Sequence, residues 1–155
     1  MKQIHLVYCP FTGLGLYNGF RGNRWLKNRI KVFKQFVMPS LLAQTNQDFI
    51  LWCSWRSEEK SNPYVKDLMV WLSYTGLRVV HTFNGVCFWD DKYSDEVARE
   101  RLFNNLNGTS RELVNIIGDT EEVIVTLQPS DDCYIDTAIE TIKQGLRDNQ
   151  AFGFR

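Results

Sequence analysis

The stretch "VIVTLQPSDDCYIDTAIETI", from Val123 to Ile142, decides the fold and contains the first candidate site. An apolar run rich in β-branched residues predicts a strand, and the spacing that follows it predicts a helix. Pro129 and Ser130 supply turn-forming residues between the two. Two adjacent carboxylates, Asp131 and Asp132, stand in this turn. They are either a solvated turn or the metal end of a nucleotide site, and the rest of the chain bears on that choice.

The same change from strand to helix recurs along the chain. Apolar runs predict strands at 4–9, 48–55, 77–83 and 122–127. Apolar residues at helical spacing and capping residues predict helices at about 24–37, 63–76, 94–106, 110–118 and 136–149. Their expected N-caps are Asn62, Ser94, Ser110 and Asp136, and Pro39 is expected to kink or end the first helix. We therefore expect one α/β domain over residues 1–155, with a mainly parallel sheet flanked by helices.

Ligands of such sheets bind beyond the carboxyl ends of the strands. Asp131 and Asp132 follow the fourth strand, and the loop from Pro10 to Gly22 follows the first, so the two segments are expected to face one crevice. The "GLGLYNG" in this loop does not match the dinucleotide-binding pattern, because Asn18 stands where that pattern needs glycine or alanine.

The first predicted helix has one charged residue on its apolar side. Positions about 100° apart place Arg29 between Trp25 and Phe33, on the arc opposite the basic residues. The remaining apolar residues of this arc are Leu26, Ile30, Phe36 and Val37, and the basic stripe consists of Arg24, Lys27, Lys31 and Lys34. A buried guanidinium requires an acceptor. The acceptor is expected either in a neighbouring loop or at the site itself, as a ligand phosphate or a site carboxylate.

Composition narrows the classes of protein. The 155 residues are 44% hydrophobic with zero net charge, as in a globular domain. Seven basic and no acidic residues precede Asp48, whereas 11 basic and 18 acidic residues form the remainder, which suggests an anionic ligand near the N-terminal third. No signal peptide or membrane-spanning run is visible, and four dispersed cysteines without a C-x-x-C pair disfavour a zinc site. We expect a cytoplasmic protein with reduced thiols.

The segment from Trp25 to Trp52, "WLKNRIKVFKQFVMPSLLAQTNQDFILW", closely resembles the putative rhamnosyltransferase family, glycosyltransferases of the GT-A type. The shared pattern is W-L-x-x-R, an aromatic-rich stretch, P-S-L-x-x-Q-T-x-x-x-F and a strand. It is carried here by Trp25, Leu26, Arg29, Pro39, Ser40, Leu41, Gln44, Thr45 and Phe49. The family's later Asp-rich turn is similar to "TLQPSDDCYI".

This resemblance implies a GT-A-like, Rossmann-like domain that binds a nucleotide-sugar donor with Mn²⁺ or Mg²⁺ for glycosyl transfer. Asp132 would be a direct metal ligand and Asp131 a metal or ribose contact. Arg29 would pair with phosphate or orient a site carboxylate, and Thr12 would contact the donor. No residue is assigned as catalytic.

Three departures from the family leave alternatives open. Pro129 replaces the first Asp of the turn, the acceptor-binding half is missing, and no Asp directly follows the second strand. Glu58 or Glu59 could replace that Asp but are expected to be solvated. Asp90 and Asp91 form another candidate pair.

The missing half could come from a homo-oligomer or a partner subunit. The main alternative is a non-catalytic structural or interaction module, with Trp52, Trp55, Phe88 and Trp89 as candidate interface residues. Nucleic-acid binding through the basic stripe is a weaker third hypothesis.

Overall fold

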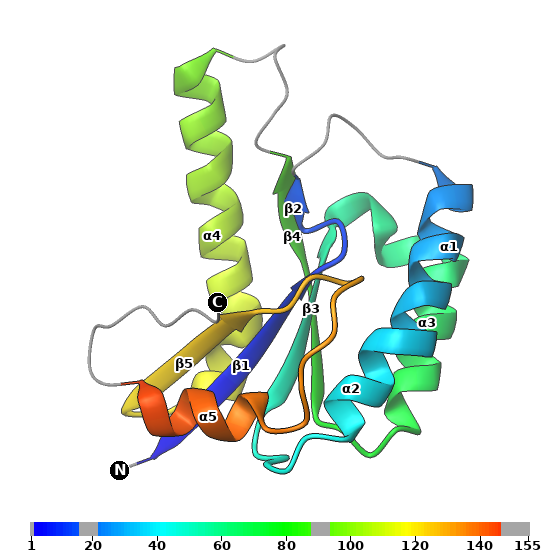
Figure 1. Cartoon of the computed structure of the whole chain (residues 1–155). Helices are drawn as coiled ribbons and strands as arrows, with labels where there is room; N and C mark the ends of the chain where they lie inside the picture. The colour runs from blue at the N-terminus through cyan, green and yellow to red at the C-terminus, as the bar shows by residue number, and fades with distance from the viewer. Residues whose placement is uncertain (1, 16–21, 88–93, 147–155) are drawn as a thin grey trace.

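The computed structural model describes residues 2–15, 22–87 and 94–146. Its centre is one five-stranded sheet in the order β2-β4-β3-β1-β5, and every pair of neighbouring strands is parallel (Figure 1). The strands are β1 (Gln3–Pro10), β2 (Leu14–Gly15), β3 (Ile50–Arg56), β4 (Val79–Cys87) and β5 (Glu122–Leu127). The prediction of a parallel α/β sheet flanked by helices is confirmed. The strand predicted at 77–83 is β4, which extends to Cys87. The two-residue β2 was not predicted.

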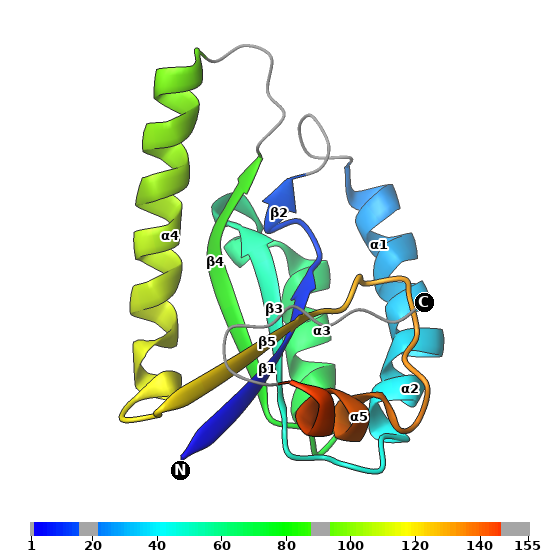
Figure 2. The same ribbon diagram turned by 60° about the vertical axis from the view of Figure 1, so that its left-hand side comes forward.

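The helices lie on both faces of this sheet. They are α1 (Asn23–Val32), α2 (Met38–Leu42), α3 (Pro63–Ser73), α4 (Asp95–Ile117) and α5 (Ala138–Gly145), with a π-helical turn at Phe33–Val37 and a 3-10 turn at Ser57–Ser61. Figures 1 and 2 show α4 on one face and the other helices on the opposite face. The main core lies between the sheet and the helices on the face opposite α4, where Val7, Leu51 and Trp55 of the strands pack against Leu26 and Phe33.

A π-helical turn joins α1 to α2 and explains how the chain tolerates Pro39. Proline lacks an N–H and its ring clashes with the carbonyl four residues earlier in a regular α-helix, whereas a wider turn relieves both problems. The helical path therefore continues to Leu42, and the prediction that it could end at Pro39 is wrong. The turn also shifts the helical phase, so Phe36 is 53% exposed instead of joining the apolar side.

Two predicted helix caps are wrong. Ser110 begins no new helix, because α4 is continuous and the Ser110 hydroxyl donates to the Leu106 carbonyl at 2.8 Å. Asp136 does not cap α5, whose N-cap position is Thr137 without a side-chain hydrogen bond. The caps at Asn62 and Ser94 are confirmed.

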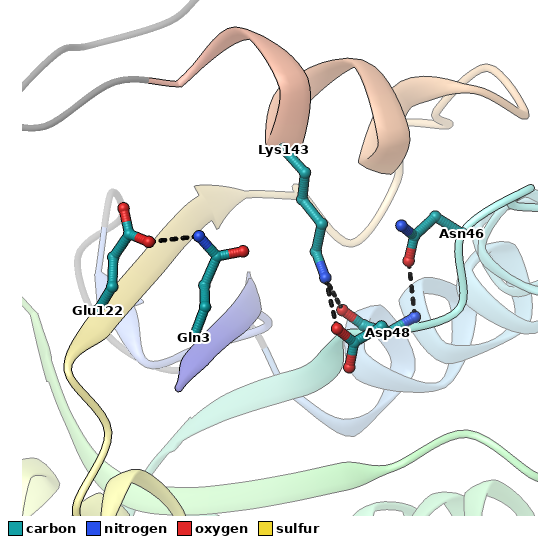
Figure 3. Close-up of polar contacts among 5 residues, drawn as sticks. All are labelled: Gln3, Asn46, Asp48, Glu122 and Lys143. Carbon is teal, nitrogen blue, oxygen red and sulfur yellow. Dashed lines mark hydrogen bonds and ion pairs between the residues drawn. The ribbon is translucent and has the colours of Figure 1, made fainter. Parts of the chain in front are cut away.

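Polar contacts at the amino-terminal edge of the sheet connect α5 to the chain before β3, and β1 to β5 (Figure 3). Lys143 donates to the Asp48 carbonyl at 2.6 Å and pairs with its carboxylate at 2.7 Å. Gln3 bonds Glu122 between the first residues of β1 and β5. These contacts fix the edge opposite the expected ligand side, so their role is structural.

Candidate functional site at the carboxyl edge of the sheet

The loop after β1 packs tightly against β3 and β4. The Gly13 amide donates to the Ser54 carbonyl at 3.0 Å, and a Cβ on Gly85 would lie 2.2 Å from the Gly13 Cα. Only glycine therefore fits at position 85 without moving backbone. This packing fixes the position of Thr12, the predicted donor contact, beside the end of β3.

Half-buried Thr12 and buried Glu59 form a hydrogen-bonded pair at this edge. The Thr12 hydroxyl donates to Glu59 Oε2 at 2.5 Å and accepts from the Arg56 amide at 3.1 Å. Glu59 is only 3% exposed, so the expectation that it is solvated is wrong. Burial raises the pKa of the Glu59 carboxyl, although the Thr12 hydrogen bond and the Arg56 charge oppose the shift. Neighbouring Glu58 is exposed and ion-pairs with Arg56.

This cluster has unused hydrogen-bonding capacity. Glu59 Oε1 and one terminal nitrogen of Arg56 are buried, and neither has a partner within the described part of the chain. Both residues line a cavity of about 140 Å³, together with Glu58 and Asn62. An acceptor and a donor that are buried beside a cavity are suited to a polar ligand, because leaving them unpaired costs about 1–3 kcal/mol each.

Arg29 pairs with Asp131, so the structure brings together two predicted site residues. Its terminal nitrogen contacts the Asp131 carboxylate, and their side chains are 18% and 48% exposed. The guanidinium also lies over the Trp25 ring, with the Cζ atom 5.2 Å from the ring centroid. The acceptor that a guanidinium on the apolar side requires is therefore a carboxylate of the candidate site.

The turn after β5 keeps Asp132 exposed. Gln128 is fully buried, and its amide donates to the carbonyls of Pro129 and Asp132 at 3.1 and 2.5 Å. These bonds hold the turn from within, whereas the Asp132 carboxylate points to no partner among the residues that the structure describes. Of the two adjacent acids, Asp131 is paired with Arg29, whereas Asp132 is exposed and makes no ion pair with the described residues.

Two polar residues that follow α2 hold the segment after the Asp turn. Gln44 is 4% exposed and donates to the Ser40 and Ile135 carbonyls at 2.9 and 2.7 Å. Its side-chain oxygen accepts from the Ile139 amide at 3.0 Å, so Gln44 supplies the cap that α5 lacks. Thr45 adds a backbone bond of 2.8 Å to the Asp136 carbonyl. The P-S-L-x-x-Q-T pattern thus positions the chain that leaves the candidate site.

The Arg29–Asp131 pair lies close to the end of β1. Burial raises the pKa of the Cys9 thiol, the charges of Cys53 and Asp131 raise it further, and the Arg29 charge lowers it. Cys9 and Cys53 are buried free thiols, which makes them core residues. Thr12 follows the same strand, so both clusters occupy the carboxyl edge of β5, β1 and β3, three neighbours in the sheet.

Other candidates contribute less. Trp55 is fully buried and Trp52 is half-buried with a hydrogen bond to Thr82, so neither forms an exposed loop patch. Phe88, Trp89, Asp90 and Asp91 lie outside the described residues. Within the described ranges, no three potential ligands among His, Cys, Asp and Glu come together as a metal cluster, and no helix is long and apolar enough to cross a membrane.

Residues 20–69 match the model of a family described as putative rhamnosyl transferase. The match contains Arg29, Gln44, Arg56 and Glu59, whereas Thr12 and the two aspartates lie outside it. No curated protein and no solved structure matches the chain. Together with the parallel α/β sheet, the family match suggests a glycosyltransferase.

Proposed function

We propose that this domain binds a nucleotide-sugar donor with a divalent cation for glycosyl transfer. The observation that carries the proposal is the pairing of Arg29 with Asp131. A residue of the segment that matches the family meets the carboxylate turn at the edge where parallel α/β sheets bind ligands. This arrangement leaves Asp132, the next residue in the chain, exposed.

The residues present fit Mg²⁺ or Mn²⁺. Mg²⁺ is commonly held by one or two carboxylates, with phosphates and water completing its coordination. Asp132 would be the direct ligand, because Asp131 already has Arg29 as its partner. When bound, the cation would stabilise the charge that develops on a departing nucleoside diphosphate. The protein's own contribution is to hold the Asp132 backbone carbonyl through Gln128 and to pair the Arg29 guanidinium with the adjacent Asp131.

The Thr12–Glu59 pair suits the base or ribose of the donor. A carboxylate would repel the diphosphate, whereas it accepts well from an N–H or a ribose hydroxyl. Arg56 could donate to an acceptor on the same group, because one of its nitrogens is buried without a partner among the described residues. The two clusters would then hold opposite ends of the nucleotide.

Calorimetric titration of UDP, GDP and dTDP, with and without Mn²⁺, tests this proposal. Asp132→Asn should abolish the metal-dependent part of the affinity. Glu59→Gln should weaken binding by roughly tenfold to a hundredfold, since hydrogen bonds to charged groups contribute about 1.5–3 kcal/mol.

Asp136→Asn is the matched control, because Asp136 is also exposed and its side chain has no hydrogen bond or ion pair within the described residues. The proposal fails if no nucleotide binds to the folded protein. It also fails if the control loses metal-dependent affinity as Asp132→Asn does.

A further inference from the structure

The outer side of α1 and of the π-helical turn after it is strongly basic. Residues 23–42 contain no acidic residue. Arg24, Lys27 and Lys31 are exposed, and none of them forms an ion pair with the described residues. A surface groove of about 560 Å³ is lined by Lys27, Asn28, Ile30, Lys31, Lys34 and Gln35. This lining offers positive charge and hydrogen-bond donors to an anionic partner.

Helix α3 runs beside α1 in the same layer (Figure 2). The Asn62 side chain, at the N-cap of α3, donates to the Asn23 side chain at the start of α1 at 3.1 Å. Farther along, Lys34 Nζ lies 4.7 Å from the centroid of the Trp71 ring. These two contacts join the helical layer near both ends of α3. The outward sides of the two helices therefore form one surface.

On this surface α3 presents apolar side chains. The residues that α3 buries toward the sheet are Val65, Leu68 and Leu72. At about 100° per residue, Val70 lies opposite these three, and Tyr74 lies one turn farther on the same side. Val70 and Tyr74 are 57% and 84% exposed. We call the following six residues the outer face: Lys27, Lys31, Lys34, Val70, Trp71 and Tyr74.

The composition of the outer face favours an anionic membrane surface as its partner. The one acid on α1, α2 and α3 is Asp67, and the adjacent Lys66 offsets its charge. Lysine ammonium groups reach lipid phosphates while their stems cover apolar surface. Tyrosine and tryptophan are enriched at the depth of the headgroups, and aliphatic side chains enter the acyl boundary below them. A nucleic-acid backbone would use the lysines but leave Val70 without a partner.

We infer that the outer face binds the surface of an anionic membrane, with α1 and α3 lying along its plane. None of the six residues belongs to the proposed donor site, so the inference is independent of it. Each lysine close to an anionic bilayer strengthens binding about fivefold. Because this attraction is screened by salt, the association should be reversible and salt-dependent.

Co-sedimentation with lipid vesicles tests the charged part of the outer face. The wild-type protein should bind equimolar phosphatidylcholine–phosphatidylglycerol vesicles, but not pure phosphatidylcholine vesicles, and high salt should release it. The double variant Lys27→Gln/Lys31→Gln should bind about 25-fold more weakly. The matched control is Arg99→Gln/Arg111→Gln, which removes the same charge from exposed positions of α4 on the opposite face and should bind as the wild type does.

A neutral substitution tests the apolar part. Val70→Asn should weaken vesicle binding several-fold and leave its salt dependence unchanged, because it removes an apolar contact without changing the charge. Circular dichroism establishes that each variant folds.

Four results would each overturn the inference. The wild-type protein shows no preference for anionic vesicles, the α4 variant loses as much affinity as the α1 variant, Val70→Asn binds as tightly as the wild type, or single-stranded RNA at the same phosphate concentration binds more tightly than the vesicles do.

Discussion

Gln44→Leu removes the side chain that ties α2 to the segment after the Asp turn. The substitution nearly preserves volume, so the main effect is the loss of three hydrogen bonds of 2.7–3.0 Å at a position that is 4% exposed. The Ile139 amide would be left buried without an acceptor, which costs about 1–3 kcal/mol. With two carbonyls also losing a donor, we expect the free energy of unfolding to fall by about 2–4 kcal/mol.

Urea unfolding followed by circular dichroism measures this loss, and hydrogen exchange of the Ile139 amide locates it. The amide should exchange faster than in the wild type by more than global destabilisation explains. Gln35→Leu is the control, because Gln35 is exposed on the preceding helical turn. A loss below about 0.5 kcal/mol, or equal to that of Gln35→Leu, would refute the assignment of Gln44 as the cap of α5.

Acidification and a glycine substitution test two further features. The pKa of both His5 and His81 is lowered to about 4, mainly by burial. As the pH falls, each histidine is therefore protonated in the unfolded chain while it is still neutral in the folded protein. Stability should therefore fall as pH drops from 6.5 toward 4, by about 2 kcal/mol for each histidine at pH 5, and urea midpoints that stay equal between pH 7 and 5 would contradict this. Gly85→Ala should destabilise the protein by more than about 2 kcal/mol, because its Cβ would meet backbone of Gly13. Gly108→Ala, whose Cβ would meet only the end of the Asn84 side chain, should be nearly neutral by the same urea assay.

The parallel sheet could be predicted because its strands and helices have distinct periodicities. Apolar runs place the four longer strands to within a few residues but miss the two-residue β2, and alternation with helices requires parallel neighbours. The need of Arg29 for an acceptor also follows from the helical wheel, although the wheel cannot choose Asp131 as its partner. That choice depends on a turn about a hundred residues later in the chain.

The features that sequence patterns missed depend on tertiary contacts. Gln44 caps α5 from another helix, so no local capping pattern marks it. Glu59 is buried and Glu58 is exposed, yet the two are adjacent acids in a single short 3-10 turn that has no readable periodicity. Phe36 left the apolar side because the π-helical turn changed the phase of the helix. Serine is a common helix cap, so Ser110 was mistaken for one. In the structure its hydroxyl bonds a carbonyl of its own helix instead.

The measurement that tests the central claim most directly is the broadening of amide NMR signals by Mn²⁺ in the presence of a nucleoside diphosphate. The account predicts the strongest broadening at Asp131 and Asp132, dependent on the nucleotide. With Mg²⁺ in place of Mn²⁺, the nucleotide should shift the amide signals of Thr12 and Glu59. Broadening centred elsewhere on the sheet, or none that requires the nucleotide, would contradict the assignment of this edge as a donor site.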